Sequence, residues 1–262
     1  MTKTILITGA TDGIGLLTAK MLAAKGHLIL LHGRNADKLA AAAKEVGSKV
    51  EVYLADLTRL GDVTSMADEI LARHANLDVL INNAGVLKAA ETRTPEGLDV
   101  RFMVNTFAPF VLTNRLLAII PKSGRVVNLS SAAQAPVDLA AMAGESRLGD
   151  MEVYAQSKLA ITVWGREMAR VLPDGPVIVA VNPGSLLASK MVKEGFGIAG
   201  NDLAIGADIL CEAALDASFA DASGKYFDND AGQFANPNAA ALNADHAASI
   251  MQEMTRIIAS IA

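Results

Sequence analysis

TILITGATDGIG, residues 4–15, is the stretch that decides the fold. Its apolar run at 4–8 predicts a strand, and Gly9, Gly13 and Gly15 follow it at the start of a predicted helix. Glycine lets the backbone approach a pyrophosphate closely, and the helix adds unpaired N–H groups and the positive end of its dipole. The turn therefore predicts a nucleotide-phosphate site. An ordinary tight turn is the alternative.

The spacing of these glycines is GxxxGxG, which differs from the common dinucleotide fingerprint GxGxxG. It indicates a different family of nucleotide-binding folds.

Apolar runs and helical stretches alternate through most of the chain. The runs are apolar throughout, as in parallel strands that are covered on both faces. The pattern predicts an α/β fold: one Rossmann domain over 1–262, with a doubly wound, mostly parallel sheet of about seven strands. Expected strands are 4–8, 27–32, 50–55, 77–82, 124–130, 177–182 and a short one near 224–228, and expected helices are 14–25, 36–46, 62–74, 98–119, 152–172, 202–217 and 245–260. Residues 185–201 contain three glycines and no clear period, which predicts a mobile loop near the substrate.

Composition restricts the class of protein. A hydrophobic fraction of 52% supports a large core, and a net charge of 23 − 28 = −5 without basic clusters argues against nucleic acid as a partner. The lone Cys211 allows no internal disulfide and is interpreted as a core residue, and the four histidines lack ligand spacing, so no metal is expected. With neither a targeting signal nor an apolar run near ~20 residues, a cytoplasmic protein without membrane contact is expected.

The end of the second expected strand reads LLHGRN, residues 30–35. A carboxylate there would bind a ribose 2′-hydroxyl, but Gly33 stands at that place and the cationic Arg34 follows. The sequence therefore predicts NADP(H) in preference to NAD(H). A solvated Arg34 without a ligand is the alternative.

YAQSK, residues 154–158, places Tyr154 and Lys158 four residues apart, on one face of a helix. An ammonium close to a phenol favours the phenolate, which predicts a lowered pKa for Tyr154 and a role in acid–base catalysis. A partly buried tyrosine beside a solvated lysine is the alternative.

Six short motifs together resemble the short-chain dehydrogenase/reductase family. They are TGATDGIG (8–15), NNAG (82–85), Asn105, NLSS (128–131), YAQSK (154–158) and NPG (182–184). The resemblance runs from Thr4 to about Asp228. A long segment before Tyr154 and the GKYF at 224–227 resemble the retinol-dehydrogenase-like and protochlorophyllide-reductase-like branch.

The resemblance implies a role for each matching residue. Tyr154 would be the acid/base, Lys158 would hold the nicotinamide ribose and lower the tyrosine pKa, and Ser131 would bind the substrate oxygen, with Ser130 as the alternative. The catalytic set is Asn105, Ser131, Tyr154 and Lys158. The cofactor set is Gly9, Gly13, Ile14, Gly15, Arg34, Asp56, Leu57, Asn83, Ala84, Gly85, Tyr154, Lys158, Pro183 and Gly184.

Asn105 permits a separate physical argument. Pro109 has no N–H, so the helical bond from residue 109 to the Asn105 carbonyl cannot form. That carbonyl is free for another partner, which in this family is a water of a proton relay.

The implied activity is hydride transfer between nicotinamide and a carbonyl or alcohol substrate. A nucleotide-binding regulatory or structural protein without turnover is the alternative from another class. A homodimer or homotetramer through the helices at 98–119 and 152–172 is expected by analogy. The 22 residues between Ser131 and Tyr154 contain an insertion, 132–153, that either covers an apolar pocket or forms an extra surface helix.

Overall fold

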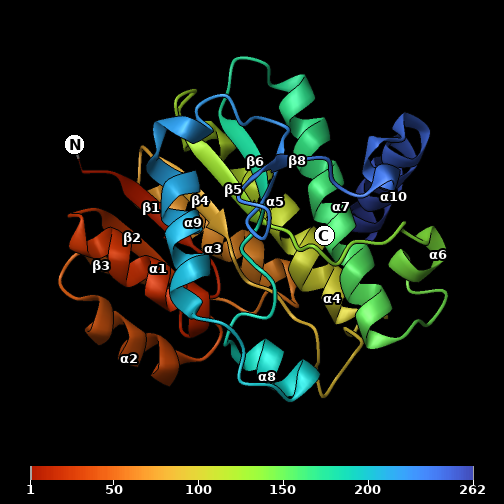
Figure 1. Ribbon diagram of the computed structural model, residues 1–262, viewed down its shortest axis with the longest axis horizontal. Helices are drawn as coiled ribbons and strands as arrows, with labels where there is room; N and C mark the ends of the chain where they lie inside the picture. Colours follow the sequence, from red (N-terminus) through yellow and green to blue (C-terminus); the bar gives the residue numbers. More distant parts are fainter. Residues whose placement is uncertain (1, 262) are drawn as a thin grey trace.

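Eight strands form one sheet in the order β3-β2-β1-β4-β5-β6-β7-β8, and helices cover both of its faces (Figure 1). The computed structural model describes residues 2–261. Every neighbouring pair of strands is parallel except β7 and β8. The strands are β1 (Thr4–Ile7), β2 (Leu28–Gly33), β3 (Val50–Leu54), β4 (Val79–Asn82), β5 (Arg125–Leu129), β6 (Val177–Asn182), β7 (Tyr226–Asp228) and β8 (Gln233–Ala235). The predicted fold class is confirmed. The sequence predicts about seven strands and does not predict β8, a short edge strand without the buried apolar run that marks the others.

Burial on both faces explains the unbroken apolar strands. In β1, Leu6 packs into the core beneath the helices α3, α5 and α7, whereas Ile5 and Ile7 pack into the core beneath α1 and α9. All three side chains have no exposed surface. Cys211 lies buried in the second core, as expected. Successive residues of a strand point to opposite faces, so both faces require apolar residues.

Seven helices of nine residues or more make up the two layers within residues 2–261. They are α1 (Gly13–Ala24), α2 (Ala36–Val46), α3 (Leu60–Arg73), α5 (Ala108–Leu116), α7 (Asp150–Val171), α9 (Leu203–Leu215) and α10 (Ala244–Ile261). Shorter elements are α4 (Val100–Phe102), α6 (Leu139–Met142), α8 (Lys190–Phe196), a π-helix (Met103–Phe107) and 3-10 turns at Leu117–Ile119, Ala217–Phe219 and Ala239–Leu242.

The helix predicted at 98–119 runs without a break from Val100 to Ile119 but changes type along its length. It consists of α4, the π-helix, α5 and a 3-10 turn, with Pro109 in the first turn of α5. In the π-helical turn the Ala108 N–H bonds the Met103 carbonyl, five residues back. Proline cannot donate the regular helical bond, so a change of helix type next to it has a local cause.

The stretch Val100–Ile119 also differs from the expectation that no apolar segment approaches membrane-spanning length. By length and composition it is the one helix among residues 2–261 able to cross a membrane, with a mean hydropathy of 1.3. Its most apolar window is 61% buried inside the fold. A core helix of a globular protein has the same properties.

The insertion and the expected substrate loop both contain helices. Within 132–153, α6 carries Ala141 and Met142 into the core, and the Val137 N–H donates to His246 of α10 at 3.2 Å. Within 185–201, the helix α8 occupies the middle of the segment predicted to be a mobile loop, and the mobility of the segment stays a prediction. Seven residues are too few to show a helical period in the sequence.

The C-terminal helix α10 packs on α7 (Figure 1). Its buried side chains Ala247, Ile250, Met254 and Ile257 follow a helical spacing and join the core that contains Trp164 of α7. α10 therefore covers part of the helix through which a dimer was expected.

Ile250→Ala tests this packing. Ile250 has no exposed surface, so we expect the free energy of unfolding to fall by about 2–5 kcal/mol in chemical denaturation. The control Gln252→Ala changes an exposed residue of the same helix and should leave the transition nearly unchanged. Equal effects of the two substitutions would contradict a packed α10.

Candidate functional site

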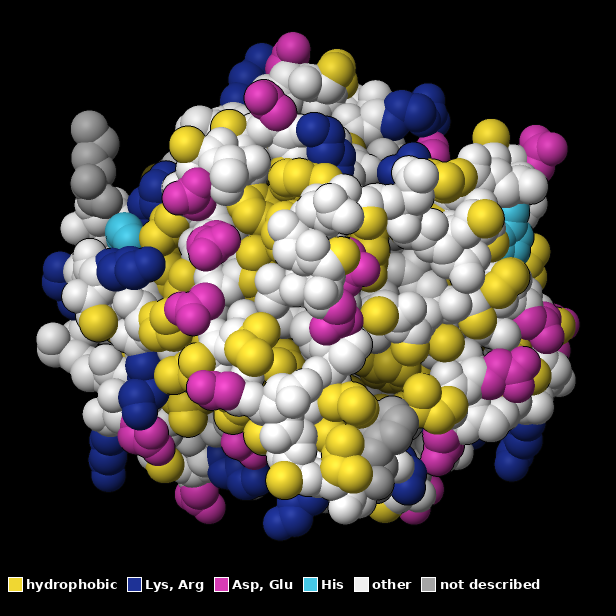
Figure 2. Space-filling view, in the orientation of Figure 1, with side chains coloured by type: hydrophobic (Ala, Val, Ile, Leu, Met, Phe, Trp, Pro, Cys, Tyr) yellow, Lys and Arg dark blue, Asp and Glu magenta, His cyan; other side chains and the backbone are white. Residues whose placement is uncertain are grey.

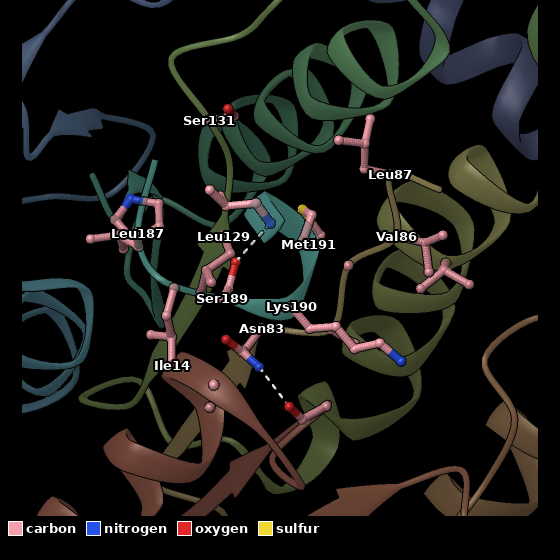
Figure 3. A pocket seen from close by; sticks show the side chains of 18 of the residues that line it. Ile14, Asn83, Val86, Leu87, Leu129, Ser131, Leu187, Ser189, Lys190 and Met191 are labelled. Atoms are coloured by element: carbon pink, nitrogen blue, oxygen red, sulfur yellow. Dashed lines mark hydrogen bonds between the residues drawn. The ribbon is translucent and has the colours of Figure 1, made fainter. Parts of the chain in front are cut away.

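A cavity of about 560 Å³ lies at the carboxyl ends of the central parallel strands (Figure 3). Open α/β sheets bind ligands at this edge, where the strand order reverses, here between β1 and β4. All residues predicted to bind the cofactor line it: Gly9, Gly13, Ile14, Gly15, Arg34, Asp56, Leu57, Asn83, Ala84, Gly85, Tyr154, Lys158, Pro183 and Gly184. Ser131 also lines the cavity, whereas Asn105 lies behind its wall.

The glycine turn is held against β4 by Asn83. The Asn83 Nδ2 donates to the carbonyls of Thr8 and Gly9 at 2.8 and 3.0 Å. Gly9 has a φ of +63°, and a Cβ there would lie 2.8 Å from the Ala84 Cα. A Cβ at Gly15 would lie 2.4 Å from the Asn83 Nδ2. Glycine is therefore required at both positions by close approach of the backbone.

His32 supports the same turn, a role that the sequence did not predict. Its Nδ1 accepts the Gly9 N–H at 3.0 Å, and its Nε2 lies 3.1 Å from the Ala55 carbonyl. These partners require a neutral imidazole with the proton on Nε2. Burial agrees with this state, because it lowers the pKa of His32 to about 4.

The end of β2 is crowded by the glycine turn. A Cβ at Gly33 would lie 2.4 Å from the Thr11 Cγ2, so an acidic side chain here would require the Thr11 side chain to move. Arg34 is exposed at the cavity rim, and Asp56 lines the same cavity. One oxygen of Asp56 accepts the Thr58 N–H at 3.0 Å.

Tyr154 and Lys158 lie side by side on α7, as the spacing predicts. The Lys158 Nζ is 5.6 Å from the centre of the Tyr154 ring and donates to the Leu129 carbonyl at 2.7 Å. Lys158 is only 4% exposed, and burial lowers its pKa to about 8. At pH 7 the amine is still mostly protonated.

The pKa of Tyr154 is raised, whereas the sequence predicts that Lys158 lowers it. Burial raises it, and a side-chain hydrogen bond with Ser131 opposes that rise. Desolvation penalises the phenolate more than its polar neighbours in the chain stabilise it. The expected lowering by Lys158 is therefore not the dominant effect.

Two adjacent serines at the end of β5 have different surroundings. The Ser130 hydroxyl is buried against α7, 3.1 Å from the Lys158 carbonyl and 2.7 Å from the Thr162 hydroxyl. The Ser131 Oγ accepts the Ala133 N–H at 3.1 Å, which leaves its proton for Tyr154 or a substrate. The geometry therefore favours Ser131 as the residue that meets a substrate oxygen.

Asn105 acts through its side chain on two neighbouring segments. Its Oδ1 accepts the Val86 N–H at 2.8 Å, while its Nδ2 donates to the Val86 carbonyl at 3.0 Å and to the Ser157 Oγ at 2.9 Å. The amide thus joins the cavity wall after β4 to α7. The water predicted at the Asn105 carbonyl stays a prediction.

The remaining wall is apolar, and sequence reasoning identified little of it. Figure 2 shows hydrophobic side chains around a hollow in the lower part of the face, near α8. The lining apolar residues include Val86, Leu87, Val104, Leu129, Met151, Leu186, Leu187, Met191 and Val192. The insertion contributes only its ends, Ala132, Ala133 and Met151, while its middle packs on the domain.

Among residues 2–261 no cluster of three or more His, Cys, Asp or Glu side chains is arranged to hold a metal. A function without a metal stays a prediction from the sequence.

Known proteins resemble this chain over most of its length. A family model described as short chain dehydrogenase matches residues 3–196. Human retinol dehydrogenase 13 is 33% identical over 86% of this chain and 76% of its own length. Mouse retinol dehydrogenase 12 is 36% identical over 71% of this chain, which spans 62% of that protein.

Two solved structures extend the comparison to ligands. A short-chain dehydrogenase from Shigella flexneri 2a str. 301 complexed with NADP is 26% identical, with a TM-score of 0.69 over 87% of this chain and 97% of its own. The landomycin C-6 ketoreductase LanV with bound NADP and rabelomycin is 30% identical, with a TM-score of 0.68 over 87% of this chain and 94% of its own.

Lys158→Met tests the burial of the amine through the pH dependence of stability. The pKa of Lys158 is about 8 in the folded chain and 10.5 as its ordinary value, so between these pH values the unfolded chain binds the extra proton. The free energy of unfolding should therefore rise with pH in the wild type, by up to about 3 kcal/mol relative to the variant. Denaturation of both proteins from pH 7 to 10 measures the difference. Parallel curves would contradict the buried amine.

Proposed function

This chain belongs to the short-chain dehydrogenase family, and we propose that it is an NADP(H)-dependent oxidoreductase that interconverts a carbonyl and an alcohol. The observation that carries the proposal is the meeting of Ser131, Tyr154 and Lys158 in one cavity with the glycine turn. A protein that only binds a nucleotide has no need for a phenol, a hydroxyl and a buried amine at the same place.

The residues of the cavity fit a nicotinamide dinucleotide. The glycine turn admits a pyrophosphate at the start of α1, because Gly9 and Gly15 have no Cβ where the backbone passes closest to its neighbours. Asp56 retains one carboxylate oxygen for the adenine, and Pro183 and Gly184 line the opposite end. The nicotinamide supplies or accepts the hydride when it is bound.

The protein groups handle the proton of the reaction. During reduction, the Tyr154 hydroxyl donates its proton to the substrate oxygen, and Ser131 donates a hydrogen bond to the same oxygen. A phenol with a raised pKa holds that proton until the substrate oxygen gains charge. The Lys158 ammonium, fixed by the Leu129 carbonyl, stabilises the phenolate that forms.

The proposed preference for NADP(H) rests on the end of β2. Gly33 supplies no carboxylate to bind a 2′-hydroxyl, Thr11 crowds that position, and Arg34 follows at the rim. A guanidinium binds a phosphate through a planar pair of donors. The bound NADP in two related structures supports this choice.

The apolar wall supports a substrate of apolar character. Side chains from the segment after β4, from Met151 of α7 and from α8 surround the space next to Tyr154. The similarity to proteins named retinol dehydrogenases points in the same direction. We therefore propose an apolar ketone, aldehyde or alcohol as the substrate class.

The cellular and oligomeric parts of the proposal rest on the sequence. They are a cytoplasmic location, no membrane or nucleic acid as a partner, and a homodimer or homotetramer. The packing of α10 on α7 argues against a dimer formed through that part of α7.

Tyr154→Phe tests the catalytic proposal. It removes the acidic hydroxyl and keeps the ring, so turnover of apolar carbonyls with NADPH should fall at least about 100-fold. NADPH affinity, followed by nicotinamide fluorescence, should change little. Tyr53→Phe removes a phenol outside the cavity and should retain activity. Unchanged turnover in Tyr154→Phe, or none in the wild type, would favour a binding protein.

Arg34→Ala tests the cofactor preference. Loss of a guanidinium–phosphate contact should weaken NADPH binding roughly 10- to 100-fold and leave NADH binding nearly unchanged. Lys44→Ala, an exposed cation of α2 away from the cavity, serves as the control for net charge. Equal NADPH affinity in wild type and Arg34→Ala would contradict the assignment.

A further inference from the structure

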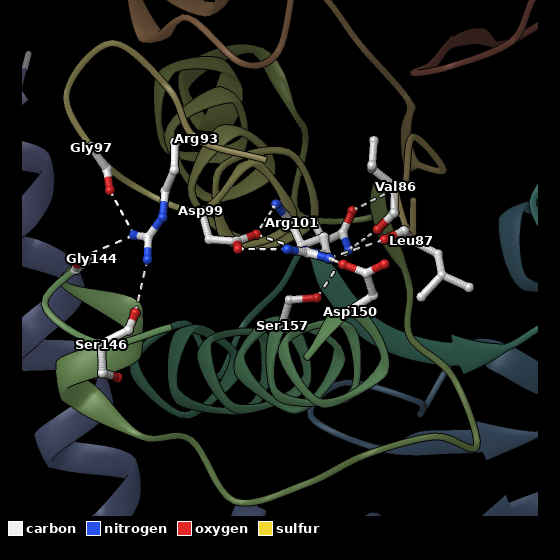
Figure 4. A network of polar contacts seen from close by, with 11 residues as sticks. Val86, Leu87, Arg93, Gly97, Asp99, Arg101, Gly144, Ser146, Asp150 and Ser157 are labelled. Carbon is white, nitrogen blue, oxygen red and sulfur yellow. Dashed lines mark hydrogen bonds and ion pairs between the residues drawn. The ribbon is translucent and has the colours of Figure 1, made fainter. Parts of the chain in front are cut away.

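A buried arginine outside the cavity joins three segments that surround it (Figure 4). Arg101 of α4 is 2% exposed. Its Nε and Nη2 donate to the Asp99 carboxylate at 2.8 and 2.7 Å, and its Nη1 lies 3.4 Å from the Leu87 carbonyl. The same Nη1 donates to Asp150, the first residue of α7.

Asp150 is not required to neutralise the arginine. Asp99 already provides a bidentate carboxylate, and it is itself only 6% exposed. The Asp150 side chain is 48% exposed, so most of its charge could be solvated without Arg101. The contact of Asp150 with Arg101 therefore serves to hold α7 in position.

The start of α7 packs on the core through Val153, but no side chain caps its first N–H groups. The N-cap position is Gly149, which makes no side-chain cap hydrogen bond. Uncapped helix ends fray, because their first N–H groups lack partners. Tyr154 lies four residues after Asp150, which is one helical turn from this end.

A second contact of the same kind lies further along α7. Asn105, four residues after Arg101, binds Val86 and the Ser157 hydroxyl. Arg101 binds the adjacent Leu87 and Asp150. The segment after β4 is thus tied to α7 on both sides of Tyr154 along the helix, once by Arg101 and once by Asn105.

We propose that the Arg101–Asp150 ion pair is a latch that positions Tyr154 by holding the first turn of α7 against the cavity wall at Val86 and Leu87. The inference rests on the proposed function, in which Tyr154 is the acid/base. Arg101 and Asp150 are positioning residues that do not meet the substrate. Small displacements of a reacting group cost rate more than affinity, because proton transfer requires near-contact geometry.

Asp150→Asn is the test, with Glu152→Gln as a matched control. Both carboxylates lie in the first turn of α7, so both substitutions remove one charge from the same end of the helix. Glu152 is exposed and makes no ion pair among the interactions described for residues 2–261, whereas Asp150 binds Arg101. Arg101 keeps its pairing with Asp99 in both variants, so a buried unpaired charge is not created.

We expect kcat to fall roughly three- to tenfold in Asp150→Asn, with the KM for NADPH unchanged, because only the acid is displaced. Fraying would admit water to Tyr154, so the high-pH limb of the kcat profile should move to lower pH as the burial effect weakens. Glu152→Gln should retain the wild-type kcat and profile. Asp150→Glu, which restores the charge, should recover part of the rate.

Hydrogen exchange of the intact protein gives a second measurement that needs no turnover. Amides of 150–158 should exchange faster in Asp150→Asn than in Glu152→Gln. Equal exchange in the two variants, or equal kcat and pH profiles, would overturn the latch. An inactive wild type would count against the proposed function alone, since the exchange comparison would still decide whether the ion pair holds α7.

Discussion

The close approach of the first glycine turn to the end of β4 is the constraint on which the site depends. Asn83 donates to the Thr8 and Gly9 carbonyls, and the Thr8 hydroxyl accepts the Ala84 N–H at 3.1 Å. These bonds join the ends of β1 and β4, two neighbouring strands after which the chain continues on opposite faces of the sheet. The strand order opens a crevice at this edge, and the bonds fix its floor. The glycine turn, Asp56, Ser131, Tyr154 and Lys158 all line the cavity above that floor.

Burial governs the pKa values of Tyr154 and Lys158. The fold buries Lys158 and leaves Tyr154 only partly exposed, and desolvation favours the neutral form of each, raising the pKa of Tyr154 and lowering that of Lys158. The phenol and the ammonium have nearly equal pKa values in water, and burial separates them, so the phenol holds its proton more tightly than the ammonium does. The spacing of Tyr154 and Lys158 predicts an effect of the nearby charge on the tyrosine pKa, but burial has the larger effect.

The helix α7 carries this chemistry and receives support along its length. The middle of α7 is buried in the core, and α10 packs against the helix. The start of α7, which has no side-chain cap, is joined to the segment after β4 through Arg101. The insertion 132–153 adds to this support, because its apolar residues pack on the domain beside α7. Val137, Ala141 and Met142 contribute to the core beside α7 and do not line the cavity, whose apolar wall includes the segment after β4, Met151 and α8.

The sequence by itself determined the sheet, the glycine turn, the absence of a carboxylate after β2 and the pairing of Tyr154 with Lys158. These features depend on neighbours in the chain: unbroken apolar runs, residues without a Cβ, and a spacing of one helical turn. Only the tertiary structure decided the π-helical turn before Pro109, the helix α8, the neutral His32, the different hydrogen-bond partners of Ser130 and Ser131, and the direction of the Tyr154 pKa shift. Each of these depends on burial or on hydrogen bonds between residues far apart in the sequence, and local patterns carry no information about which distant groups will exclude water from a side chain.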